Sequence, residues 1–332
     1  MLNPNLKLNV KIFADDCEQV PIRKGFGEGL VQAGETNKNI VALSADLTES
    51  TQMHLFKDKF PERFVEIGVA EQNLATVASG MAAMGKYPFF SSYAMFSPGR
   101  NWEQIRTTLA YNDRAAVIVG SHAGVSVGPD GGTHQAIEDI ALMRVIPRMT
   151  VLSPCDAIQA KQATLALSAD PKLAYLRLAR EKTPVITTED TPFELGKGQI
   201  LYRPEGIAHV TIIATGGLVA NAIRAAKDLE KKHIKALVVN IHTIKPIDSE
   251  LLIKCAKETK AVVTVEEHQI VGGLGGAVSE VLAANYPVPI EFIGVKDEFG
   301  QSGTPTQLIE HYGMGRDAIV AAVLKVIERK TS

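Results

Sequence analysis

The chain has 332 residues, of which 45% are hydrophobic and 22% are charged, and its net charge is −2. This length allows two ordinary domains, and the composition is that of a globular protein rather than a disordered one. The small net charge excludes the strongly basic surface of many nucleic-acid and membrane-surface binders, so we expect neither kind of partner.

Three cysteines, Cys17, Cys155 and Cys255, are isolated along the chain and show no metal-ligand spacing. They predict a reducing, cytoplasmic location and no metal site in this chain. The first residues contain no apolar core typical of a signal peptide, and no run of 18 apolar residues predicts a spanning helix.

Short apolar strands alternate with helical segments along the first half of the chain. Such alternation is typical of a parallel sheet covered on both faces. Helices are expected at Glu71–Met84 and Ala157–Leu167. Small residues in the first of these predict close packing, either within the chain or against another subunit. The expected strands lie at Ile40–Ser44, Phe64–Ile67, Tyr87–Ser91, Ala115–Ser121, Met149–Leu152 and Ala174–Leu178.

A segment rich in proline, threonine and glycine follows, and a second alternation begins after it. We therefore expect an α/β protein with two doubly wound domains. The predicted parts are an N-terminal arm (1–20), a first domain (21–183), a linker (184–200) and a smaller α/β domain (201–332). In the second domain we expect strands at Val210–Ala214, Ala236–Ile241, Ala261–Val265 and Ile290–Val295, with helices at Val219–Lys231, Ser249–Thr259 and Gly276–Ala284, and two closing helices.

Three segments carry candidate chemistry, although each also has an ordinary structural explanation. Glu71 begins a helix, where a carboxylate is commonly only a dipole partner. Four aromatic residues fall within 89–96, as in a buried strand or in a wall for a flat ring. The glycine-rich loop 120–135 follows an apolar strand and contains His122, Asp130 and His134, so it should lie where open α/β sheets bind ligands.

The segments Gly68–Asn73, "GVAEQN", and Gly120–Gln135 resemble motifs of the transketolase family. The resemblance implies a pyrimidine-binding domain for thiamine diphosphate, followed by a transketolase C-terminal domain. Glu71 would then bond the cofactor's aminopyrimidine nitrogen. Phe96 would stack on that ring, Tyr93 would lie beside it, and Asp46 of the "SADLT" segment would face the cofactor. The Pro98-Gly99-Arg100 segment lacks a further aromatic residue found in some members.

The same resemblance implies a substrate site. His122 and His134 join Glu71 as expected catalytic residues, for contact with the substrate and for proton transfer, and Asp130 would bond a substrate hydroxyl. An arginine fork is suited to bidentate phosphate binding. The residues expected to bind a sugar phosphate are Arg23, Ser50, His122, Asp130, His134 and Arg180.

The resemblance covers about Pro21 to Ile327 and leaves out the diphosphate-binding domain of the full-length enzymes. It includes Glu266-Glu267-His268-Gln269 and Asp297–Gly303 of the second domain, to which no catalytic role transfers. The glycine run 272–276 misses the dinucleotide-binding spacing. We therefore expect one half of a split transketolase of the pentose phosphate pathway. Its partner would be an N-terminal subunit that holds most of the magnesium or calcium contacts, in an α2β2 assembly with homodimer contacts.

Three alternatives remain open from the sequence. Deoxyxylulose-phosphate synthase shares the glutamate and a similar loop, although His122 and "SADLT" are closer to transketolase. The β subunit of a 2-oxoacid dehydrogenase is also a half-enzyme, but a small oxo acid needs no set of phosphate-binding residues. A non-catalytic partner subunit is the third alternative. The sequence predicts neither the sugars nor the role of the arm.

Overall fold

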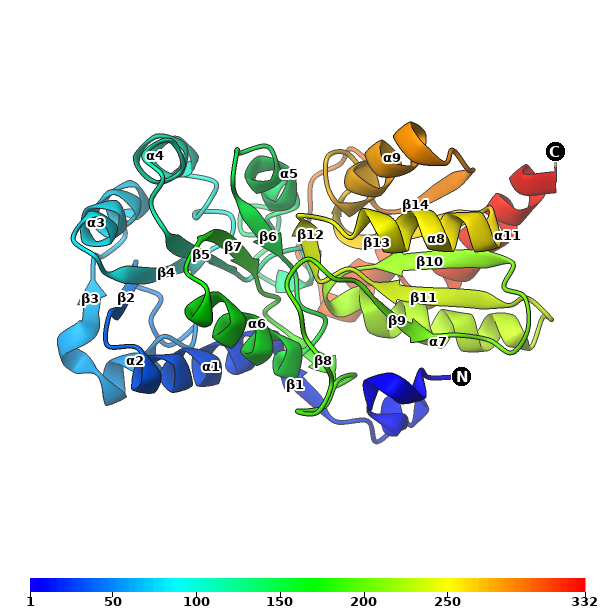
Figure 1. Cartoon of the computed structure of the whole chain (residues 1–332), viewed down its shortest axis with the longest axis horizontal. Coiled ribbons are helices and arrows are strands. Elements are labelled where there is room, and N and C mark those ends of the chain that lie inside the picture. The colour runs from blue at the N-terminus through cyan, green and yellow to red at the C-terminus, as the bar shows by residue number, and fades with distance from the viewer. Residues whose placement is uncertain (332) are drawn as a thin grey trace.

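The computed structural model describes residues 1–331, which form two helix-covered sheets side by side along the long axis of the molecule (Figure 1). In the first sheet the strand order is β12-β6-β7-β5-β4-β2-β3, and in the second it is β14-β13-β10-β11-β9. This architecture confirms the predicted α/β class. No helix in the described part of the chain is long and apolar enough to cross a membrane.

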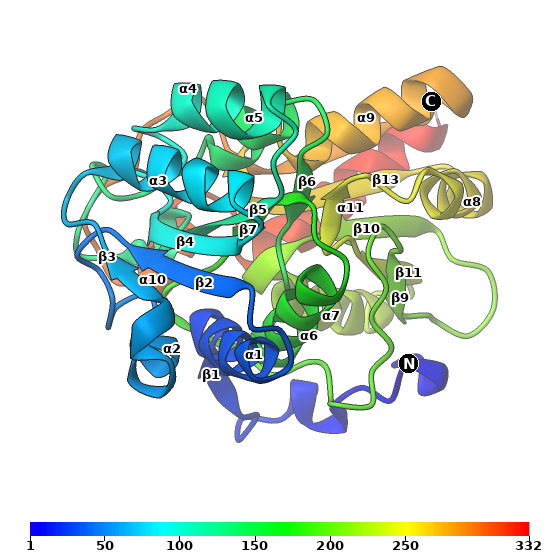
Figure 2. The same cartoon turned by 60° about the vertical axis from the view of Figure 1, so that its left-hand side comes forward.

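The first sheet is parallel except at β12, and helices cover both of its faces (Figures 1 and 2). Its strands β2 and β7 are buried at every position, as expected of a sheet with no solvent-facing side. Its strands are β2 (Ile40–Ser44), β3 (Phe64–Glu66), β4 (Tyr87–Tyr93), β5 (Ala116–Ser121), β6 (Thr150–Leu152), β7 (Leu173–Arg177) and β12 (Thr243–Lys245). Its helices are α1 (Ile22–Thr36), α2 (His54–Lys59), α3 (Glu71–Ala83), α4 (Trp102–Gln104), α5 (Asp139–Arg144) and α6 (Ala157–Ala169).

The second sheet is parallel except at its edge strand β9, which pairs antiparallel with β11. Helices α8 and α9 lie against each other, while α7 packs with α11. The strands are β9 (Gln199–Tyr202), β10 (Val210–Ala214), β11 (Ala236–Asn240), β13 (Val262–Gln269) and β14 (Ile290–Val295). The helices are α7 (Val219–Glu230), α8 (Ser249–Thr259), α9 (Leu274–Asn285), α10 (Pro305–His311) and α11 (Arg316–Thr331).

The sequence did not predict where two segments pair, the strand β12 and the N-terminal arm. The strand β12 comes from the second half of the chain, yet it pairs with β6 at the edge of the first sheet. The N-terminal arm runs beside the second sheet, where the Asn3 N–H donates to the Leu201 carbonyl at 2.9 Å (Figures 1 and 2). The arm ends in β1 (Gln19–Pro21), which pairs with β8 (Lys182–Pro184).

Candidate active site

The predicted site residues gather at one edge of the first sheet, beyond the carboxyl ends of its parallel strands. Asp46 and Ser50 follow β2, and Glu71 follows β3. Arg23 lies in the first turn of α1. The other predicted residues lie on or after β4, β5 and β7: Tyr93, Phe96, His122, Asp130, His134 and Arg180. This edge is where open α/β sheets bind ligands, because the strand-to-helix loops meet there.

Glu71 is the first residue of α3, and its side chain is only 1% exposed. The Ser92 hydroxyl donates to its Oε1 at 3.2 Å, and Arg100 Nη1 donates to its Oε2 at 2.6 Å. The Asn101 side-chain amide donates to the Glu71 backbone carbonyl at 2.9 Å. The carboxylate is therefore held by the end of β4 and the segment after it rather than left to water, as a buried charge requires.

Arg100 was not among the predicted site residues. Its guanidinium carbon lies 4.7 Å from the centre of the Phe96 ring, while its Nη1 bonds Glu71. The side chain is 47% exposed. The sequence predicted no role for Arg100. It indicated only that the segment Pro98-Gly99-Arg100 lacks a further aromatic residue found in some family members.

The aromatic residues form one continuous wall with the two histidines. The Tyr93 ring stacks on His122 with centroids 3.9 Å apart, and on Phe96 with centroids 6.3 Å apart. The His134 ring meets Phe96 edge-on, with centroids 5.3 Å apart. The structure thus brings Tyr93, Phe96, His122 and His134 together, as the resemblance implied for a flat ring and its substrate.

Positive charge collects beside His122. Arg23 Nη1 lies 3.2 Å from His122 Nε2, and Ser121 Oγ lies 2.9 Å from His122 Nδ1. Because arginine can only donate, Nε2 accepts and the ring proton belongs on Nδ1. Burial, followed by the charges of Arg23, Arg180 and His134, lowers the pKa of His122 to about 3. Burial and then Arg180 lower the pKa of Arg23. The positive groups of this cluster repel one another, and a bound anion would relieve that repulsion.

Arg180 and Asp130 also meet, with Nη1 and Oδ1 separated by 3.6 Å. Arg180 Nη1 donates to the Val127 carbonyl as well, so the arginine holds the glycine-rich loop. A buried Arg23 Nε has no partner among the described residues, which leaves one donor free for a ligand.

Two buried residues, Gln135 and Glu267, hold the glycine-rich loop by hydrogen bonds. The sequence predicted no role in the site for either of them. Gln135 Nε2 donates to the Val125 carbonyl at 3.0 Å and to the backbone carbonyl of Gln301, in the second half of the chain, at 3.0 Å. Glu267 Oε1 accepts from the Ser126 N–H at 2.6 Å. Burial raises the pKa of Glu267. The "DEFGQSG" and "EEHQ" segments therefore support the loop, although neither reaches the aromatic wall.

Asp46 and Ser50 lie farther from this cluster. Asp46 is exposed with φ 61°, and its N–H donates to Glu66 Oε1 at 2.7 Å. Glu66 also accepts from Thr48 Oγ1 at 2.8 Å and from the Gly68 N–H at 2.9 Å. Within residues 1–331, no recorded contact joins Asp46 or Ser50 to the other predicted site residues. Glu66 is a further residue that the sequence did not identify.

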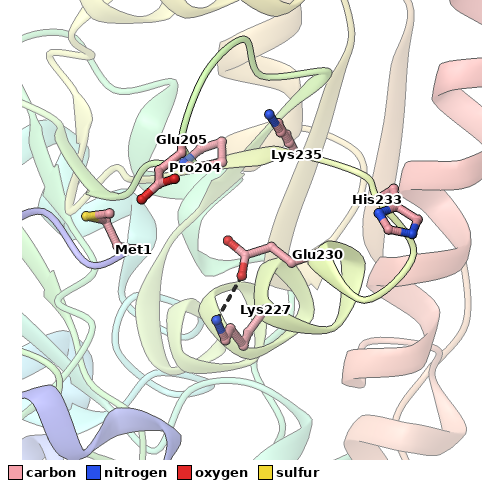
Figure 3. A pocket seen from close by; sticks show the side chains of 7 residues that line it. All are labelled: Met1, Pro204, Glu205, Lys227, Glu230, His233 and Lys235. Carbon is pink, nitrogen blue, oxygen red and sulfur yellow. Dashed lines mark hydrogen bonds and ion pairs between the residues drawn. The ribbon is translucent and has the colours of Figure 1, made fainter.

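Several surface hollows lie away from these residues, among them one of about 580 Å³ lined by residues such as Arg144, Lys245 and Glu280. Another of about 410 Å³ lies on the second domain beside the N-terminus (Figure 3). Its charges are mixed, and Lys227 and Glu230 bond each other at 2.8 Å. A smaller hollow of about 300 Å³ borders the glycine-rich loop at Ser126 and Glu267. In the described part of the chain, no three histidine, cysteine, aspartate or glutamate residues group as metal ligands.

Comparisons with known proteins agree over nearly the whole chain. Residues 18–185 match the family model "Transketolase, pyrimidine binding domain", and residues 196–319 match "Transketolase, C-terminal domain". A putative transketolase C-terminal section from Methanocaldococcus jannaschii is 43% identical, over 93% of this chain and 97% of that protein. A 6-deoxy-6-sulfo-D-fructose transketolase subunit from Clostridium sp. is 40% identical, over 96% and 98%. The solved structure "Split gene transketolase, inactive beta4 tetramer" has 45% identity and a TM-score of 0.87, over 94% and 99%.

Proposed function

Because the chain belongs to the transketolase family, we propose that it is the C-terminal subunit of a split transketolase that transfers a two-carbon ketol unit between sugars with thiamine diphosphate. The observation that carries this proposal is the buried Glu71 carboxylate, which Arg100 links to the Phe96 ring, in one cluster with Tyr93 and the Arg23–His122 pair. A carboxylate, a flat aromatic face and an anion site at one edge of one sheet are what a ring cofactor and a charged sugar require.

The residues present fit the cofactor's ring. The space between Glu71 and Phe96 already accommodates a planar donor, the Arg100 guanidinium, which bonds the carboxylate and lies over the ring. An aminopyrimidine can make the same two contacts. When bound, thiamine diphosphate supplies a nucleophilic carbon for attack on a ketose carbonyl. Glu71 would hold the ring nitrogen and its proton, Phe96 would hold the ring face, and Tyr93 and Asp46 would lie at the cofactor's border.

The remaining residues would bind and orient the sugar. Neutral His122, with its proton on Nδ1, can accept a hydrogen bond from a substrate hydroxyl at Nε2 when Arg23 turns to the anion. His134, edge-on to Phe96, can exchange a proton with the carbonyl side, and Asp130 can accept from a hydroxyl. Arg23 and Arg180, with Ser50, would bind the terminal anion. One relative is named for a sulfonated fructose, so the anion in this chain's substrate is phosphate or another tetrahedral oxyanion.

We also propose that activity requires a partner. The chain contains no Gly-Asp-Gly motif followed by asparagine for diphosphate and metal, and three relatives are named as a C-terminal section or as subunits. An N-terminal subunit would supply the diphosphate-binding domain and the magnesium or calcium, in an α2β2 assembly with contacts between copies of this chain. The solved relative is described as an inactive β4 tetramer, which agrees with inactivity of such a chain alone.

Reconstitution tests this function. The chain would be mixed with a diphosphate-domain subunit, thiamine diphosphate and magnesium, and assayed for ketol transfer from a ketose phosphate to an aldose phosphate. We expect turnover by the mixture and none by either subunit alone. Condensation of pyruvate with an aldose phosphate would instead indicate a deoxyxylulose-phosphate synthase. Robust transfer by the isolated chain would refute the split assignment.

A further inference from the structure

We propose that Arg100 is an internal competitor for the cofactor's ring: its guanidinium fills the Glu71–Phe96 site in the free chain and leaves when the ring enters. This inference rests on the proposed function and adds to it a step that sets cofactor affinity. It rests on one arrangement, in which the same planar group makes both contacts expected of the ring. Arg100 Nη1 donates to Glu71 Oε2 at 2.6 Å, and its guanidinium carbon lies 4.7 Å from the Phe96 ring centre.

The two occupants cannot be present together. Glu71 is 1% exposed, its Oε1 accepts from Ser92, and its Oε2 accepts from Arg100. Each carboxylate oxygen can accept more than one hydrogen bond, so the competition is for space: a ring that bonds Oε2 from the side of Phe96 must displace the guanidinium that lies there. A ring stacked on this face of Phe96 must likewise take the place of the guanidinium, because two planar groups cannot share one face of one ring.

The exchange needs only a side-chain movement. The backbone on both sides of Arg100 is fixed, because the Arg100 N–H donates to the Phe96 carbonyl at 2.9 Å. The next residue, Asn101, donates through its amide to the Glu71 carbonyl at 2.9 Å and to Ser97 Oγ at 3.2 Å. The Arg100 side chain itself is 47% exposed, so it can turn into water without disturbing this frame.

The contact also explains how an isolated subunit keeps a buried carboxylate. Without both a ring and Arg100, the Glu71 carboxylate would keep only the Ser92 hydroxyl as a side-chain donor. A buried charge without an opposite charge is strongly destabilising. Arg100 supplies the missing cation until the ring replaces it. The consequence is that the measured affinity equals the intrinsic affinity multiplied by the fraction of chains whose site is free.

The first experiment asks whether the site accepts a guanidinium at all. Arg100→Ala opens the space, and methylguanidinium at millimolar concentration should then bind and change the fluorescence of Trp102, the single tryptophan, two residues from Arg100. We expect saturable binding by Arg100→Ala and none by wild type or by Arg106→Ala, which removes an exposed arginine of the same segment. The double variant Glu71→Gln/Arg100→Ala should bind far more weakly. No binding by Arg100→Ala would overturn the inference.

The second experiment titrates the same chains with thiamine diphosphate and magnesium. If the guanidinium occupies the site in about 80–90% of chains, Arg100→Ala should bind the cofactor about five- to tenfold more tightly than wild type. Methylguanidinium should compete with it. Cofactor binding by wild type that Arg100→Ala leaves equal or weaker would refute the inference and leave the proposed function intact. Absence of cofactor binding by every variant, including those reconstituted with the diphosphate-domain subunit, would refute the proposed function itself.

Discussion

His122 should make the stability of this chain depend on pH in a predictable direction. Burial, then Arg23, Arg180 and His134, lowers the pKa of His122 to about 3, and an unfolded histidine titrates near its ordinary value of 6.5. Below about pH 6.5 the unfolded chain therefore binds a proton that the folded chain refuses. The stability that comes from a neutral His122 is fully present above pH 6.5 and is lost as the pH falls toward 3.

The size of this effect follows from the same values. One pKa unit corresponds to about 1.36 kcal/mol, so at about pH 5 the lost stability attributable to His122 is about 2 kcal/mol. The discount for solvent screening is small, because the side chain is only 2% exposed. The perturbation is His122→Asn, which keeps a polar group but removes the titration.

The assay is urea unfolding at about pH 7.5 and about pH 5, followed by Trp102 fluorescence. Wild type should lose about 2 kcal/mol more than His122→Asn between the two conditions. Burial also lowers the pKa of His242, to about 4, but His242 is present in both chains and cancels in the comparison. His233→Asn, at an exposed histidine, serves as the control. Equal pH-dependent losses in wild type and His122→Asn would refute the argument that cationic neighbours and burial keep this ring neutral.

Three further predictions concern activity and stability. Glu71→Gln should lower ketol transfer by the assembled enzyme by more than about 100-fold, because an amide cannot hold the ring proton as a carboxylate does; near-normal turnover would mean that Glu71 only begins a helix. Arg180→Ala should lower kcat/KM for phosphorylated donors by about 10- to 100-fold, equivalent to about 1.5–3 kcal/mol, and should spare hydroxypyruvate; equal losses for both donors would assign Arg180 to loop support, through Val127. Asp139→Ala should destabilise the chain by about 3–5 kcal/mol in urea unfolding, because Arg177, 6% exposed and bonded to Asp139 at 2.7 Å, would remain buried and unpaired, whereas Asp113→Ala at an exposed pair should change little.

The sequence by itself determined the alternation of strands and helices. The predicted strands at Ile40–Ser44, Val210–Ala214 and Ile290–Val295 and the helix at Ser249–Thr259 have the bounds found in the structure. These elements could be predicted because a buried parallel strand must be a short apolar run, whatever it packs against. The glycine-rich loop 120–135 could also be placed at the ligand-binding end of the sheet, because it follows such a strand, whereas the individual site residues were assigned by their resemblance to transketolase motifs.

Pairings between distant segments were decided only by the tertiary structure. The strand β12 is three residues long and lies in the second half of the chain, so nothing local indicates that it extends the first sheet beside β6. The arm likewise has little periodic pattern, and its contact with β9 depends on an exposed sheet edge that only folding creates.

The contacts that hold the candidate site also depend on the tertiary structure. Glu66, Gln135 and Glu267 each act through hydrogen bonds to loops elsewhere in the chain, and such bonds leave no spacing in the sequence. Arg100 is 29 residues from Glu71, and an isolated arginine predicts only a surface charge. Its place over Phe96 exists because the turn after β4 returns to the start of α3. The motifs of the sequence therefore indicated which residues to expect in the site, and the fold decided which of them are paired in the free chain.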